Sequence, residues 1–153
     1  STSANCLQPD GQNDNDWNQG LLFLNPSRVW LQPPGYVTRM FSRNYEPLAV
    51  QSDVLNNHDS LAVSAQLSRD RKTLVLQVVN FGEHPLTADL ELAGFKPRRS
   101  TVKVETLAGS LNSRNTAQNT ELITPTSRIW SAWRQNARAA YTFAPYSVTV
   151  MKF

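Results

Sequence analysis

The chain has 153 residues, which suits one domain with its own hydrophobic core and is too short for a complete (β/α)8 barrel of about 250 residues. Hydrophobic residues make up 40% and charged residues 18%, a balance that excludes an intrinsically disordered chain and a coiled coil. The net charge of +3 comes from scattered Lys and Arg, and the longest apolar run is residues 21–24. These features argue against nucleic-acid binding and against a membrane span of about 20 residues.

Residues 1–45 differ in pattern from the rest and form the first of two predicted domains. A polar loop at residues 10–16 precedes the apolar run at 21–24, and a short amphipathic helix, residues 34–43, follows. The helix is indicated by apolar side chains at helical spacing after two prolines: Pro33, Pro34, Tyr36, Val37, Met40 and Phe41. Such a βα or αα fragment must dock on the second domain, on another copy, or on a part of a longer chain. We expect that it docks on another copy of the chain or on a part of a longer chain.

From residue 46 to 153, hydrophobic residues alternate with polar ones, which is the period of a strand with one buried face. The runs, each expected to place an apolar face on the core, are 48–50, 61–67, 74–78, 86–92, 102–104, 141–143 and 146–150. Short strands at such spacing predict a mainly β fold, an antiparallel β-sandwich resembling a jelly roll. Residues 108–138 interrupt the rhythm and are predicted to be a long loop that carries function or covers something.

The sequence gives little support for a metal or cofactor. Cys6, His58 and His84 are the only soft or imidazole ligands, and their spacing does not close a zinc site. The loop at 10–16 alternates Asp and Asn as calcium ligands do, but Asn15 stands where an EF-hand requires Gly. We favour a solvated turn, with a calcium loop and a substrate-facing loop as alternatives. No metal and no cofactor are therefore predicted.

No residue stands out as catalytic. The chain lacks a G-x-S-x-G elbow, and neither histidine has a Ser and an acid in a spacing that indicates a catalytic triad. A retaining glycosidase needs two carboxyls about 5 Å apart, and nothing in the sequence recommends such a pair. The glutamates lie in predicted turns or on polar strand faces: Glu46, Glu83, Glu91, Glu105 and Glu121.

Four tryptophans have polar neighbours of the kind that surround sugars. Burial with a satisfied N–H is the favoured interpretation for a small β domain. The alternative is that Trp130 and Trp133, on the predicted long loop, form an exposed sugar platform.

Two stretches carry a resemblance to a known family. Residues 13–26 read Asn-Asp-Asn-Asp-Trp-Asn-Gln-Gly-Leu-Leu-Phe-Leu-Asn-Pro, and residues 32–37 read Gln-Pro-Pro-Gly-Tyr-Val. Together they resemble the end of the catalytic barrel in glycoside hydrolase family 51 α-L-arabinofuranosidases. The rest of the chain is similar to the C-terminal jelly roll of that family, with Val-Asn-Phe-Gly at 79–82 and Pro-Tyr-Ser at 145–147.

The resemblance implies that residues 1–45 end a (β/α)8 barrel and that residues 46–153 are a C-terminal sandwich serving as its scaffold. It implies a retaining, exo-acting enzyme that releases terminal arabinofuranosyl groups from arabinoxylan or arabinan. The two catalytic glutamates are expected on barrel strands upstream, so this chain alone is predicted to be inactive. Gln19 resembles a family position that hydrogen-bonds arabinose, with Trp17 beside it, although some members have Pro at the Gln19 position.

Two other hypotheses stay open. One is a non-catalytic module that binds plant polysaccharide through Trp130, Trp133 and the polar loop. The other is a structural sandwich that makes protein contacts.

Overall fold

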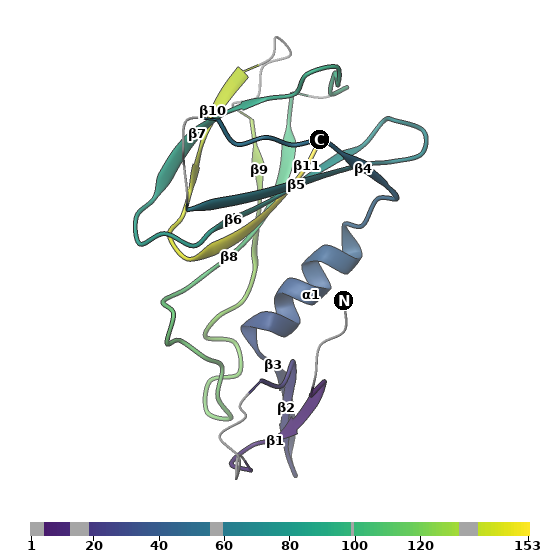
Figure 1. Ribbon diagram of the computed structural model, residues 1–153. Helices are drawn as coiled ribbons and strands as arrows, with labels where there is room; N and C mark the ends of the chain where they lie inside the picture. Colours follow the sequence, from purple (N-terminus) through teal and green to yellow (C-terminus); the bar gives the residue numbers. More distant parts are fainter. Residues whose placement is uncertain (1–4, 13–18, 56–59, 99, 132–137) are drawn as a thin grey trace.

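The computed structural model describes residues 5–12, 19–55, 60–98, 100–131 and 138–153, and within these ranges the chain is mainly β (Figure 1). The elements are β1 (Leu7–Pro9), β2 (Leu22–Asn25), β3 (Arg28–Leu31), α1 (Pro33–Arg43), β4 (Leu48–Val50), β5 (Leu61–Leu67), β6 (Leu74–Asn80), β7 (Leu86–Glu91), β8 (Val102–Ala108), β9 (Thr126–Trp130), β10 (Arg138–Phe143) and β11 (Ser147–Lys152). Among the described residues, no helix is long and apolar enough to cross a membrane.

The strands form three sheets. β4-β5-β6-β11-β8-β9 is an antiparallel sheet, β10 pairs with β7 in a second antiparallel sheet, and β1-β2-β3 is a small sheet whose β1 and β2 are parallel. The first two sheets face each other across a hydrophobic core, which confirms the predicted mainly β antiparallel sandwich. Its fully buried centre includes Val102, Val104 and Met151 from the large sheet and Phe143 from β10.

β6 runs through the middle of the large sheet and is buried on both faces. Leu76 and Val78 point into the core between the sheets, whereas Val75 points to the opposite face. Successive side chains of a strand alternate between faces, so a strand covered on both sides becomes a continuous apolar run.

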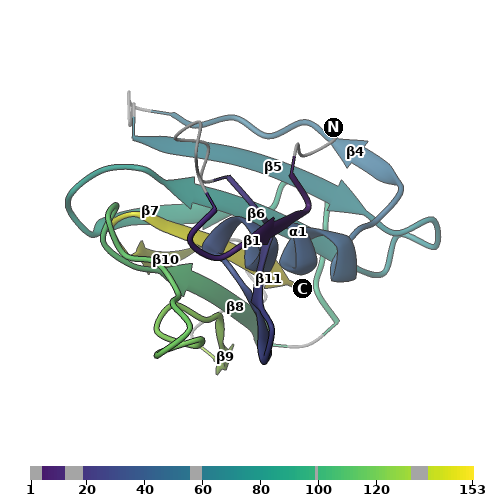
Figure 2. The same cartoon turned by 90° about the horizontal axis from the view of Figure 1, so that it is seen from below.

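Helix α1 covers that opposite face. Tyr36 and Met40 pack against Val75, Leu107 and Val150, and Met40 is 0% exposed. Figures 1 and 2 show the helix along the large sheet, next to the small sheet. The expectation that the apolar face of the helix needs a partner outside this chain is therefore wrong: the outer face of the sheet carries its own apolar patch.

Three sequence-based expectations fail in detail. Residues 108–138 are not one loop, because β9 lies within them and pairs with β8. Its sequence, Thr-Ser-Arg-Ile-Trp, belongs to an exposed edge strand without apolar alternation. Leu48 and Val50 of β4 are 39% and 37% exposed instead of facing the core, because β4 is the other edge of the sheet. β1 and β3 were not among the predicted strands.

Candidate functional site

The backbone that follows Gln19 is fixed by buried contacts, while Gln19 itself is exposed. The N–H of Gly20 donates to the Oε1 of buried Gln8, 3.1 Å away. A Cβ on Gly20 would lie 2.7 Å from the Cβ of Gln8 and 2.9 Å from Cε1 of Phe23, so only glycine fits there. The exposed side-chain amide of Gln19 carries both donor and acceptor groups, and its role toward a sugar stays a prediction.

The β2–β3 hairpin packs against the segment that contains Gly20. Phe23 and Trp30 are opposite each other in the two strands, and their ring centroids are 6.3 Å apart. Trp30 is buried, and its Nε1 donates to the backbone carbonyl of Asn115, 3.2 Å away. The indole N–H is thus satisfied by a loop 85 residues further along the chain.

Asn115 fastens that loop to the start of α1 and is 2% exposed. Gln32 forms two hydrogen bonds with its backbone: Nε2 donates to the carbonyl over 2.7 Å, and the N–H of Asn115 donates to Oε1 over 3.1 Å. The Asn115 side chain donates to the carbonyls of Leu31 and Ile123 and accepts from the N–H of Ile123. Sequence reasoning found Gln32 only as part of a family motif and missed Asn115, because a buried Asn in a polar loop has the same local signature as a solvated one.

Gly35 lets the helix begin close to β2. A Cβ on this residue would lie 2.5 Å from the carbonyl oxygen of Leu21 and 2.6 Å from Cδ2 of Leu31. The N–H of Gln32 donates to the same Leu21 carbonyl over 2.9 Å. The Gln-Pro-Pro-Gly stretch is therefore the junction at which the hairpin, the helix and the Asn115 loop meet.

The two motifs of the predicted jelly roll, residues 79–82 and 145–147, also lie close together. Asn80, at the end of β6, is 1% exposed, and its Nδ2 donates to the carbonyls of His84 and Ala144. The N–H of Gly82 donates to Asn80 Oδ1, and the Ser147 hydroxyl donates to the Ala144 carbonyl. One asparagine thus holds the β6–β7 and β10–β11 turns together.

Trp130 does not lie on an open loop. It is half-buried at the end of β9 and packs edge-on against Tyr141, with centroids 5.1 Å apart. Arg128 donates to the Tyr141 hydroxyl over 2.8 Å. Trp130 ends β9 of the large sheet, whereas Gln19 precedes β2 of the small sheet. Trp17, Trp133 and His58 lie outside the described residues. The sugar-platform role stays a prediction.

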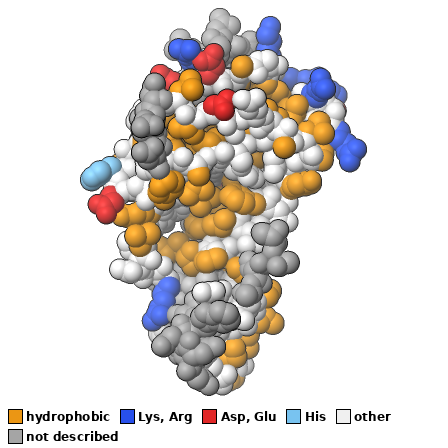
Figure 3. Space-filling model, viewed as in Figure 1, with side chains coloured by type: hydrophobic (Ala, Val, Ile, Leu, Met, Phe, Trp, Pro, Cys, Tyr) orange, Lys and Arg blue, Asp and Glu red, His pale blue; other side chains and the backbone are white. Residues whose placement is uncertain are grey.

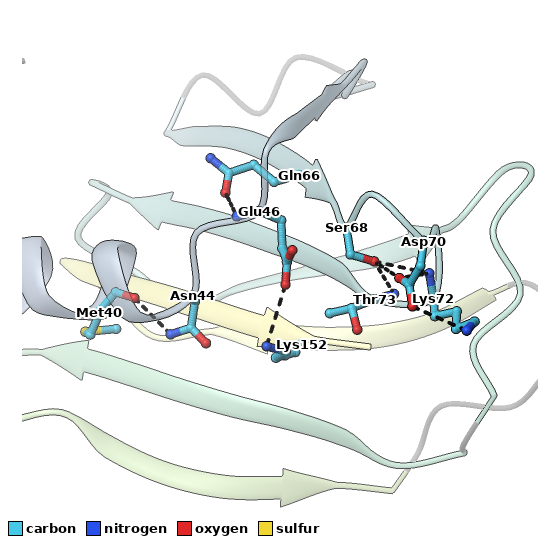
Figure 4. A network of polar contacts seen from close by, with 9 residues as sticks. All are labelled: Met40, Asn44, Glu46, Gln66, Ser68, Asp70, Lys72, Thr73 and Lys152. Atoms are coloured by element: carbon cyan, nitrogen blue, oxygen red, sulfur yellow. Dashed lines mark hydrogen bonds and ion pairs between the residues drawn. The ribbon is translucent and has the colours of Figure 1, made fainter.

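Among the described carboxylates, Asp70 has a structural role. Asp70 accepts from the Ser68 hydroxyl over 2.6 Å and from the Lys72 N–H over 3.1 Å, closing the β5–β6 turn (Figure 4). These hydrogen bonds, the Ser68 bond first, hold the pKa of Asp70 below its ordinary value, the opposite of what a general acid needs. Among the residues that the structure describes, no three His, Cys, Asp or Glu side chains gather where a metal could bind.

The comparisons with known proteins agree with this architecture. The family model of the α-L-arabinofuranosidase C-terminal domain matches residues 12–147. The chain belongs to this family. A comparison with curated protein sequences returned no match.

Solved structures with the same fold extend the comparison. An arabinose complex of an α-L-arabinofuranosidase from Thermotoga maritima matches 88% of this chain and 31% of its own length, with 21% identity and a TM-score of 0.77. An arabinose-bound GH51 α-L-arabinofuranosidase matches 97% of this chain and 23% of its own, with 19% identity and a TM-score of 0.82. The chain therefore spans less than a third of these proteins.

The fold is also found outside arabinofuranosidases. The catalytic domain of a GH30 xylanase C from Talaromyces cellulolyticus matches 95% of this chain and 28% of its own length, with 18% identity and a TM-score of 0.63. The fold alone therefore does not select a substrate.

Proposed function

We propose that this chain is the C-terminal portion of a retaining, exo-acting α-L-arabinofuranosidase that releases terminal arabinofuranosyl groups from arabinoxylan or arabinan. The observation that carries the proposal is the family match over residues 12–147, which contains β2, β3 and α1 and the strands of the sandwich from β4 to β10. On this proposal residues 1–45 are the end of the catalytic barrel and residues 46–153 are its scaffold. The catalytic glutamates lie upstream, and this chain by itself is inactive.

The junction around Gln32 supports the scaffold role. The buried bonds between Gln32 and Asn115 and the packing of Met40 on the large sheet join the two parts of the chain into one unit. A strand or helix contributed to the barrel from this unit is held at a fixed position relative to the sandwich, which is what a site assembled from several segments requires.

Exposed apolar side chains also support it. Figure 3 shows apolar side chains gathered across the middle of one face. An apolar groove of about 480 Å³ lies beside the first turn of α1, and its lining includes Phe81, 56% exposed, and Leu111, 75% exposed. Apolar surface of this kind marks protein–protein contacts, so we propose that the groove faces the barrel.

The proposal is tested on the longer enzyme of which this chain would be the C-terminal portion. Purified enzyme incubated with arabinan should release only arabinose, and proton NMR at early times should show the α-anomer first, because a covalent intermediate retains configuration. Release of internal oligosaccharides, or of the β-anomer first, would contradict the exo-acting, retaining assignment.

A further inference from the structure

A second hollow lies at the far end of α1, away from Gln19. Phe41, Ser42 and Tyr45 line it from the helix end, and Gln66 of β5 and Gln77 of β6 line it from the sheet. Its volume is about 690 Å³, within the range of about 300–1,000 Å³ that small-ligand sites occupy. Figure 2 shows that β4 and β5 extend beyond the edge of α1.

The two glutamines present amide groups to this hollow. The Oε1 of Gln66 accepts from the backbone N–H of Glu46 over 3.0 Å, and Figure 4 shows its nitrogen turned the other way. The Oε1 of Gln77 accepts from the Ser64 hydroxyl over 2.9 Å. Each oxygen already accepts one hydrogen bond, and no described residue accepts a hydrogen bond from either Nε2 group.

The Gln77 amide is the informative one, because this residue is only 8% exposed. Buried polar groups are almost always paired, with protein or with water, so a donor without a protein acceptor at the wall of a hollow is available to a bound ligand. Ser64 faces Gln77 directly across the strands, and Gln66 is one position further along the same face. The sheet thus holds the two amides side by side.

The chemistry of the lining indicates what that partner is. None of the five lining residues carries a formal charge, and the charged neighbours Glu46 and Lys152 are paired with each other over 3.8 Å. The lining offers hydrogen bonds from two amides and a serine hydroxyl. The apolar face beside them is the ring of Tyr45, which is 64% exposed. Sugars present hydroxyls that both donate and accept, next to flat apolar faces.

We propose that this hollow, lined by Phe41, Ser42, Tyr45, Gln66 and Gln77, binds a neutral saccharide of a polysaccharide chain, at a site separate from the one at Gln19. The choice of a saccharide over another neutral polar ligand rests on the proposed function. The site holds a polymer on the scaffold while cleavage takes place elsewhere.

Nitrogen–proton correlation NMR on this chain tests the proposal. We expect a dissociation constant of about 1 mM, so arabinotetraose and xylotetraose are titrated separately to about ten times that concentration. At least one of the two sugars should shift the backbone amide signals of Tyr45, Gln66 and Gln77. Trigalacturonate, which is anionic, should cause no such shifts. Absence of shifts with both neutral sugars, or shifts around Gln19 or Trp130 instead, would overturn the proposal.

Variants sharpen the test. Gln77→Met keeps the side-chain volume but removes the donor, and should weaken binding about five- to tenfold, while Gln118→Met on the exposed loop should not. Tyr45→Ala changes an exposed ring, so it leaves the fold intact and should weaken binding at least as much. Unchanged affinity in Tyr45→Ala would contradict the site whatever Gln77→Met does. Activity of the longer enzyme on arabinan is measured independently, so the proposed function and this site can fail separately.

Discussion

At the scale of single residues, Gln19 and Asn115 have opposite environments. Gln19 is exposed on a backbone fixed by Gln8 and Gly20, and Asn115 is buried with its side-chain amide hydrogen-bonded on both ends. An exposed amide on a rigid support is suited to bind a ligand, whereas a fully paired buried amide is suited to hold the fold.

Gln19→Ala in the longer enzyme should therefore affect catalysis and not stability. Losing one or two hydrogen bonds to a sugar lowers kcat/KM by roughly ten- to a hundredfold. Gln12→Ala, on the exposed turn nearby, is the matched control and should keep the full rate. Unchanged kinetics in a folded Gln19→Ala variant would assign Gln19 a structural role.

Asn115→Ala should destabilise the chain by about 3 kcal/mol in urea denaturation. The substitution leaves the carbonyls of Leu31 and Ile123 and the N–H of Ile123 without their side-chain partner in a buried place. Asn112→Ala, an exposed position of the same loop, should change stability by less than about 0.5 kcal/mol. Equal stability of the two variants would show that the loop is not fastened through Asn115.

At the scale of elements, α1 is the unit that links the small sheet to the sandwich. Met40→Ala should cost about 2–5 kcal/mol, because it leaves a cavity between the helix and the large sheet. Thr38→Ala on the exposed side of the helix is the control. The unfolding transition of both variants should stay single. A separate early transition in which helix signal is lost would mean that α1 and the sandwich do not fold together.

Sequence patterns predicted the elements that follow a simple period. The strands β5, β7, β10 and β11 alternate clearly, and α1 has helical spacing after its two prolines, beginning one residue earlier than expected. β9 was predicted as a loop, and β4 was predicted to face the core. Both are edge strands, which need no apolar face toward a core. Long-range contacts such as Gln32 with Asn115 leave no periodic signal, since they join segments 83 residues apart. For the same reason, the hollow at the end of α1 had no counterpart in the sequence analysis.

At the scale of the whole molecule, the chain is one packed unit that lacks the larger part of its structural relatives. This chain covers 31% and 23% of two matched arabinofuranosidase structures. The apolar face of α1 packs on the large sheet of the sandwich. Self-association through this face is therefore no longer expected. The groove with Phe81 and Leu111 is the surface that we expect to pack against the barrel.

Hydrolysis of 4-nitrophenyl α-L-arabinofuranoside by this chain and by the longer enzyme, measured side by side, tests the central claim most directly. The account predicts turnover by the longer enzyme and no release above a buffer blank by residues 1–153, because the two catalytic carboxyls lie upstream. Turnover by the isolated chain that is abolished by replacing one of its own Asp or Glu residues would contradict the account.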